Sequence, residues 1–155
     1  PTDQAQHELT HLRILLECEG ACLSIRQGGI DWESRLTAAH HKLSHIEKRV
    51  RGSADHMPLF ILWAKAEQAF HETLISDCGS DVLKATHAMI YQRFRQQVFN
   101  SDKKFVFVVE NIEQHQGILD AALMRDEALI RSRIYSHLER NLVFDMPPEL
   151  PKLPY

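Results

Sequence analysis

The sequence predicts an all-α fold, an antiparallel bundle of about six helices. Apolar residues recur every three or four positions through most of the 155 residues, which is the helical period. Residues that break helices are rare, with six glycines in all and Pro58 alone between positions 2 and 146. Only short breaks separate the helical stretches, and short connections make consecutive helices antiparallel neighbours.

We expect helices at about residues 5–27, 32–50, 57–77, 81–99, 102–124 and 127–144. The first has apolar residues at helical spacing, namely Leu9, Leu12, Leu15, Leu16, Cys22, Leu23 and Ile25. Gly28 and Gly29 end it, and Asp31 can cap the second. Pro58 is tolerated in the first turn of the third, where its missing N–H would have no partner.

The second half of the chain has turn residues at each expected boundary. Gly79 ends the third helix, and Ser80 and Ser101 can cap the fourth and fifth. Residues 105–109 read FVFVV, which favours a strand, but a lone strand would have no partner, so we predict helix. Asp126 caps the sixth helix. We expect one domain over 1–146 and an extended, proline-rich tail over 147–155.

Composition excludes several classes of protein. The 18 basic residues against 21 acidic ones give a net charge of −3, which provides no basic footprint for nucleic acid. Three cysteines with no paired spacing do not build a disulfide framework, and we expect Cys18 and Cys22 to be small core residues. No run of apolar residues is long enough for a membrane span and no signal peptide is evident, so we expect a cytoplasmic protein.

Glu67 and His71 are the first pair of possible metal ligands. They lie four residues apart on the third helix and therefore share one face. A carboxylate and an imidazole at this spacing can hold one metal ion, although a solvated pair at the surface has the same spacing.

His115 and His137 form the second pair. They lie eleven residues before and after Asp126, so both are about 16 Å from the turn at ~1.5 Å rise per residue. In an antiparallel hairpin they are level, and apolar residues surround both at helical spacing. Two histidines on facing apolar surfaces need partners. A metal ion would satisfy both, and so would backbone groups or buried water.

Together the two pairs offer three imidazoles and one carboxylate. Nitrogen and oxygen donors of this kind suit a divalent Zn, Ni, Fe, Mn or Co ion, with Zn as the first choice. The remaining histidines give no such set: we expect His40, His41 and His45 at the surface, and see no partner ligands for His7, His11, His56 and His87.

Several segments resemble the effector-binding (FCD) domain of GntR-type regulators of the FadR subfamily. Residues 66–74 read AEQAFHETL, similar to D-x-x-F-H-x-x-L, and residues 114–122 read QHQGILDAA, similar to E-H-x-x-I-L-x-A-I. Arg125-Asp126 followed by His137-Leu138 is similar to the G-D…H-L ending. The opening from Glu8 to Glu17 and the turn at 78–80 also match, so the resemblance covers about residues 7–140.

This resemblance implies a helical bundle that senses a ligand and forms a homodimer. It implies a metal held by Glu67, where the family has Asp, together with His71, His115 and His137. A small organic acid would bind beside the metal, with Arg13 as the candidate for its carboxylate and Arg93 as a second candidate. The family reads DNA through an N-terminal winged-helix domain. We expect this chain to lack that domain and not to bind DNA itself.

Two other functions stay open. A metal-dependent hydrolase or lyase could use the same ligands to activate water, with Glu72 and Glu113 as possible general bases. A metal-free helical interaction module would instead keep its histidines as satisfied core polar groups.

Overall fold

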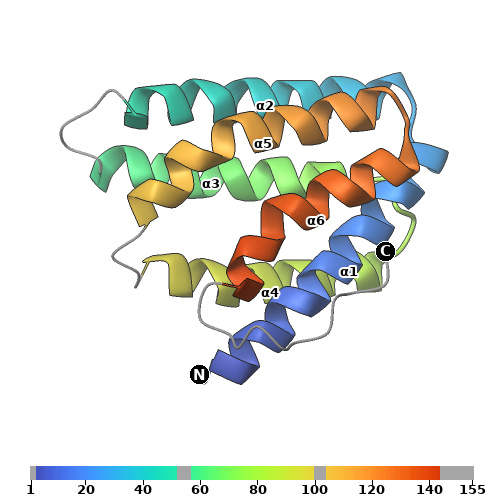
Figure 1. Ribbon diagram of the computed structural model, residues 1–155. Helices are drawn as coiled ribbons and strands as arrows, with labels where there is room; N and C mark the ends of the chain where they lie inside the picture. Colours follow the sequence, from blue (N-terminus) through green and yellow to red (C-terminus); the bar gives the residue numbers. More distant parts are fainter. Residues whose placement is uncertain (1–2, 52–56, 100–103, 144–155) are drawn as a thin grey trace.

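The computed structural model describes residues 3–51, 57–99 and 104–143. These residues form six helices (Figure 1): α1 (Asp3–Gln27), α2 (Ile30–Arg51), α3 (Met57–Leu74), α4 (Asp81–Phe99), α5 (Lys104–Leu123) and α6 (Glu127–Val143). Strands are absent from these three ranges, so the all-α prediction is confirmed. The FVFVV segment at 105–109 is helical, as predicted. The expected tail at 147–155, the domain boundary at 146 and the Ser101 cap lie outside the described residues.

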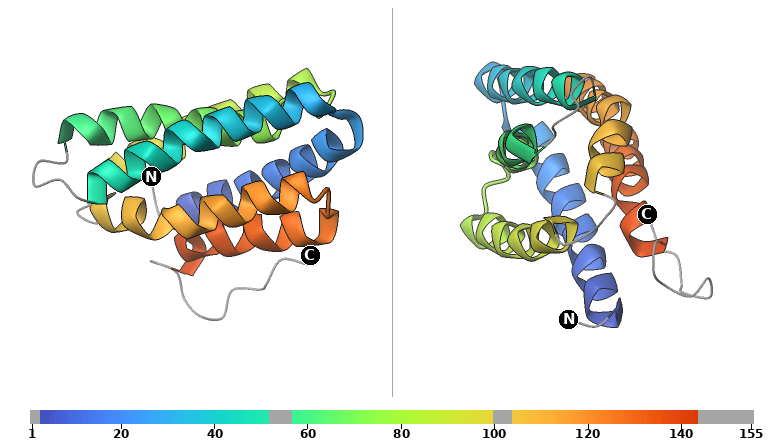
Figure 2. Two further views of the ribbon diagram at one scale, coloured as in Figure 1. Left: turned by 90° about the horizontal axis from the view of Figure 1, so that it is seen from above. Right: turned by 90° about the vertical axis from the view of Figure 1, so that its left-hand side faces the viewer.

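The helices pack as two groups that share an interior. α2 packs against α3 and α5, while α1 packs against α4 and α6. Contacts of α5 with α6, and of α1 with α3, join the groups. Figure 2 shows α1 between α4 and α6 when the molecule is seen from its end. Residues on α1, α3, α5 and α6 therefore reach a common interior.

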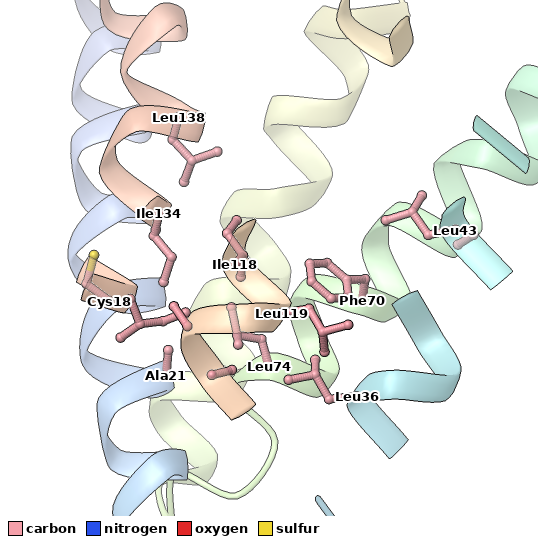
Figure 3. Packing of buried hydrophobic residues seen from close by; sticks show 14 of the residues in the cluster. Cys18, Ala21, Leu36, Leu43, Phe70, Leu74, Ile118, Leu119, Ile134 and Leu138 are labelled. Carbon is pink, nitrogen blue, oxygen red and sulfur yellow. The ribbon is translucent and has the colours of Figure 1, made fainter. Parts of the chain in front are cut away.

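The core lies at this junction. Phe70 and Leu74 of α3 are fully buried and belong to one cluster with Ile118 of α5 and Ile134 of α6 (Figure 3). Cys18 is a buried free thiol in the same cluster, and Cys22 is also buried and free, as expected. This packing determines which face of α3, α5 and α6 points inward.

The turn residues behave as predicted at two boundaries and differently at a third. The Ser80 hydroxyl accepts the Leu83 N–H at 3.1 Å, and the Asp126 carboxylate accepts the Leu129 N–H at 3.0 Å. The predicted Asp31 cap is wrong. The Gly29 carbonyl already accepts a helical N–H from Glu33 at 3.1 Å, so Asp31 lies inside the first turn of α2.

The expected apolar face of α1 is partly wrong. Leu12 and Leu15 are 40% and 44% exposed, whereas Ile14 and Cys18 are fully buried. Because α1 packs against three other helices, its buried surface is broad and includes polar residues, and leucine spacing alone does not reveal its position.

Candidate metal centre

Three helices bring the four predicted ligands to one place. α3 carries Glu67 and His71 one turn apart, beside the buried Phe70 that anchors this face. α5 supplies His115 and α6 supplies His137. All four side chains are buried, and His71 and His115 have no exposed surface.

The possible ligand atoms of these four residues all lie within 4.8 Å of one another. One oxygen of Glu67 is 2.9 Å from Nε2 of His71 and 3.9 Å from Nε2 of His115. The rings of His115 and His137 are 4.7 Å apart between centroids. The α5–α6 hairpin therefore places its two histidines level with each other, next to the α3 pair.

Each of the three imidazoles directs its Nδ1 away from this cluster, toward an oxygen acceptor. The contacts are His71 to Glu17 at 2.7 Å, His115 to both oxygens of Glu47 at 3.2 Å, and His137 to Gln114 at 2.7 Å. Carboxylate and amide oxygens accept, so Nδ1 carries the hydrogen in all three rings. A neutral ring of this tautomer offers its Nε2 lone pair to a metal.

The inward nitrogens fit a metal ion. Within the described part of the chain, Nε2 of His115 is buried and makes no hydrogen bond, and the carboxylate within hydrogen-bond distance of Nε2 of His71 is that of Glu67, itself a predicted ligand. Buried polar atoms in this state are rare in native proteins and point to an ion or another missing partner. Three imidazole nitrogens and a carboxylate oxygen form a donor set typical of divalent transition metals.

Without a metal, the cluster holds a proton instead. Burial lowers the pKa of His71, but the negative charges of Glu17 and Glu67 outweigh it and raise the pKa to about 9. Burial raises the pKa of Glu67, while His71 and Arg13 lower it more, so the net shift is downward. The pKa of Glu17 also lies well below its usual value, because His71 and Arg13 outweigh the effect of burial.

Arg13 lies beside Glu67, one of the four predicted ligands, whereas Arg93 does not. Arg13 is fully buried, with its guanidinium 3.6 Å from Glu17, 3.8 Å from Glu67 and 4.7 Å above the ring of Tyr91. Arg93 is exposed on α4, outside the buried cluster, and its predicted role stays a prediction.

Sequence reasoning missed the outer partners of the centre. Glu17 and Glu47 are buried acids that hold His71 and His115. A signal existed for Glu47, which lies four residues after Leu43 and three before Val50, on the core face of α2. The same spacing marked His87, which lies four residues after Leu83 and three before Ile90 and is fully buried against Glu17.

One histidine prediction is wrong. His40 is buried, with its ring 5.7 Å from that of Phe70, whereas His41 and His45 are exposed as expected. α2 packs against both α3 and α5, so its buried face is wider than a single stripe.

No helix among the residues that the structure describes combines the length and the apolar character needed to cross a membrane.

The described residues form an all-helical bundle, and three imidazoles and one carboxylate are buried at its centre. A family model described as the FCD domain matches residues 8–140, and the chain belongs to this family. The resemblance drawn from the sequence motifs is thereby confirmed.

Two curated relatives extend this finding. The chain is 30% identical over 139 residues to an uncharacterized HTH-type transcriptional regulator, BphR, of Paraburkholderia xenovorans, covering 87% of this chain and 54% of the relative. It is 28% identical over 141 residues to the HTH-type transcriptional repressor GlaR of Escherichia coli, covering 88% and 62%. The chain thus spans little more than half the length of these relatives. No solved structure matches it.

Proposed function

We propose that this chain is the effector-binding domain of a GntR-type transcription regulator that recognises a small organic acid at a metal centre. Membership of the FCD family and the names of two relatives support the regulatory part. The chain's own acidic balance supports a role in sensing rather than in DNA contact. We propose that DNA is bound by a separate N-terminal winged-helix segment and that the regulator works as a homodimer, not as an enzyme.

One observation carries the metal assignment. The inward Nε2 of His115 lacks a hydrogen bond among the described residues, the inward Nε2 of His71 faces only the predicted ligand Glu67, and the Nδ1 atoms of both rings are held by buried acids. We assign Glu67, His71, His115 and His137 as the ligands. When bound, a divalent ion, with Zn as first choice, would supply a Lewis-acidic position for a carboxylate oxygen.

Arg13 is our candidate for the second contact with the acid. Its guanidinium is buried 3.8 Å from Glu67, so it lies where a carboxylate at the metal would need a countercharge. Two parallel N–H donors of a guanidinium match the two oxygens of a carboxylate. Binding of the acid would favour one arrangement of the helices, and in the intact regulator this preference would reach the DNA-binding segment.

Metal content tests this proposal. We expect about one metal ion per chain in tag-free protein, measured by mass spectrometry after incubation with Zn, Ni or Mn, because four ligands converge on one point. The His115→Ala/His137→Ala variant should lose the ion. The matched control, His41→Ala/His45→Ala, removes two exposed imidazoles from α2 and should retain it.

A screen of carboxylic acids by thermal shift then tests the effector. The expected result is a rise in the melting temperature with some acids in the metal-loaded chain, and a smaller rise in Arg13→Gln. Wild-type protein that binds none of the three metals would contradict the centre and leave a metal-free module.

A further inference from the structure

A buried histidine on α4 contacts Glu17, the partner of the predicted ligand His71, without belonging to the four ligands. His87 has no exposed surface, and its Nε2 is 2.9 Å from Oε1 of Glu17. Because an ionised carboxylate can only accept, His87 donates this hydrogen bond. A buried imidazole in a helical core is costly unless its polar atoms are hydrogen-bonded, and the carboxylate of Glu17 meets this need at Nε2.

Glu17 uses its two oxygens for two different rings. Oε2 accepts the Nδ1–H of His71 at 2.7 Å, while Oε1 accepts from His87, with Arg13 Nε at 3.6 Å from the same atom. A glutamate side chain has several free torsions, and fixing them costs entropy. Partners at both oxygens fix the carboxylate plane, and this plane sets the orientation of the His71 ring.

The same arrangement occurs at a second imidazole of the centre. Nε1–H of Trp63 donates to Glu47 at 3.2 Å, and Glu47 accepts the Nδ1–H of His115. In both cases a buried ring N–H holds a buried carboxylate, and the carboxylate holds a ligand. The two carboxylates come from different helices, α1 and α2, and so do the two rings that hold them, α4 and α3, so the repetition indicates a shared role in orienting the ligands.

α4 also places a second ring behind the centre. Tyr91 lies one turn after His87, with 6.3 Å between the centroids of these two stacked rings. The ring of Tyr91 is also 6.3 Å from that of His71 and lies under the guanidinium of Arg13. α4 therefore contacts the centre indirectly: His87 contacts Glu17, which holds His71, and Tyr91 contacts Arg13, which lies beside Glu67.

We propose that His87 is a positioning residue of the metal centre, which holds Glu17 so that His71 presents Nε2 to the ion. This inference rests on the proposed metal site and adds an outer residue from a helix that supplies none of the four ligands. Outer partners of metal-bound histidines commonly affect metal affinity by about 10–100-fold.

The test compares metal affinity and coordination in variants of the full chain. His87→Phe removes the donor but keeps a ring, and should weaken Zn²⁺ binding about tenfold in a chelator competition. It should also shift the visible d–d bands of the Co²⁺ form, which a loss of stability alone would not do. His87→Gln retains an N–H donor and should recover most of the affinity. His41→Phe, the same change at an exposed position on α2, should have no effect.

A double-mutant cycle shows whether His87 acts through Glu17. The effect of His87→Phe should largely disappear in a Glu17→Gln background, because the carboxylate to be held is gone. If the Phe variant does not fold, His87→Leu takes its place in the same cycle. Wild-type affinity and an unchanged Co²⁺ spectrum in the variant would overturn the inference, as would additive effects. Wild-type protein that binds no metal would instead overturn the proposed centre itself.

Discussion

At the scale of single residues, the Glu67 carboxylate has the most basic neighbours of the four predicted ligands. One of its oxygens lies within 4 Å of His71, His115 and Arg13, so three basic groups share one atom. Residues 66–74 match the family motif with Glu where Asp is usual, so the carboxylate extends one methylene further from α3. The burial of the side chain shows that the core accommodates the extra length.

Substitutions at Glu67 should separate charge from length. Glu67→Gln keeps the shape but removes the charge, and we expect Zn²⁺ affinity to fall by at least about 100-fold, since loss of a direct ligand should cost no less than loss of an outer partner. Glu67→Asp should retain most of the affinity. Glu72→Gln, at a less buried position of α3, is the control. Chelator competition measures all three, and equal affinities for the Glu67→Gln variant and the wild-type protein would exclude Glu67 as a ligand.

The raised pKa of His71 predicts how the stability of the metal-free chain depends on pH. Its pKa is about 9 in the folded chain, against 6.5 for an unperturbed histidine. The proton therefore stabilises the fold fully below pH 6.5, and this contribution is lost as the pH rises through 9. Urea unfolding in the presence of EDTA should show a free energy of unfolding that falls across this window. The fall should be absent in His71→Gln, and a wild-type stability that rises instead would contradict the assignment.

At the scale of helices, the relative positions of two residues could be predicted from the sequence where both lie on one helix or on one helical hairpin. The regular rise of a helix placed Glu67 with His71, and the short α5–α6 turn placed His115 level with His137. The Asp126 and Ser80 caps followed from local hydrogen bonding.

What the sequence could not predict depends on how distant helices pack. Glu17 on α1 reaches His71 because α1 lies beside α3, and Glu47 on α2 reaches His115 because α2 lies beside α5. The burial of His40 and the exposure of Leu12 and Leu15 have the same origin. The fraction of a helix surface that is buried depends on how many other helices pack against it, and the spacing of apolar residues does not reveal how many do.

Arg125 connects the α5–α6 turn to the end of α1. Its guanidinium donates to the carbonyls of Ile25 at 2.6 Å and Gly28 at 3.0 Å, and pairs with Glu33 on α2 at 2.6 Å. Its backbone has a φ of 56°, the left-handed region, which is unfavourable for a residue with a side chain.

Removing this connection should destabilise the bundle. We expect Arg125→Ala to lower the free energy of unfolding by about 1–3 kcal/mol, mainly through the two lost hydrogen bonds to carbonyl groups, since a partly exposed ion pair adds little. Arg125→Gly should lose less, because glycine tolerates the positive φ. Arg133→Ala, an exposed change on α6, should stay within about 0.5 kcal/mol of wild type in the same urea titration. An Arg125→Ala variant as stable as Arg133→Ala would contradict the role of this connection.

At the scale of the whole molecule, charged groups and thiols share one interior. Glu17, Glu67 and Arg13 lie beside a hydrophobic cluster that includes Cys18. Two carboxylates face one guanidinium, and a protonated His71 supplies the second positive charge that balances them.

The rate at which the buried thiols react with a reagent measures how often the core becomes accessible to solvent. Burial, together with the charge of Glu17, raises the pKa of Cys18 to about 12, and burial also raises that of Cys22. All three cysteines are free and buried. A thiol-reactive chromophore at about pH 8 should therefore react slowly with the folded chain and with all three thiols after denaturation, because the reaction needs an exposed thiolate. Rapid reaction of Cys18 in the folded chain would contradict this packing.

X-ray absorption at the zinc edge of the metal-loaded chain tests the central claim most directly. The account predicts a first shell of nitrogen and oxygen at about 2.0–2.1 Å, with the scattering pattern of three imidazoles and no sulfur. The His87→Phe variant should keep this ligand count while binding more weakly. A sulfur shell near about 2.3 Å, or a shell with fewer than three imidazoles, would show that the ion binds elsewhere and would contradict the metal centre.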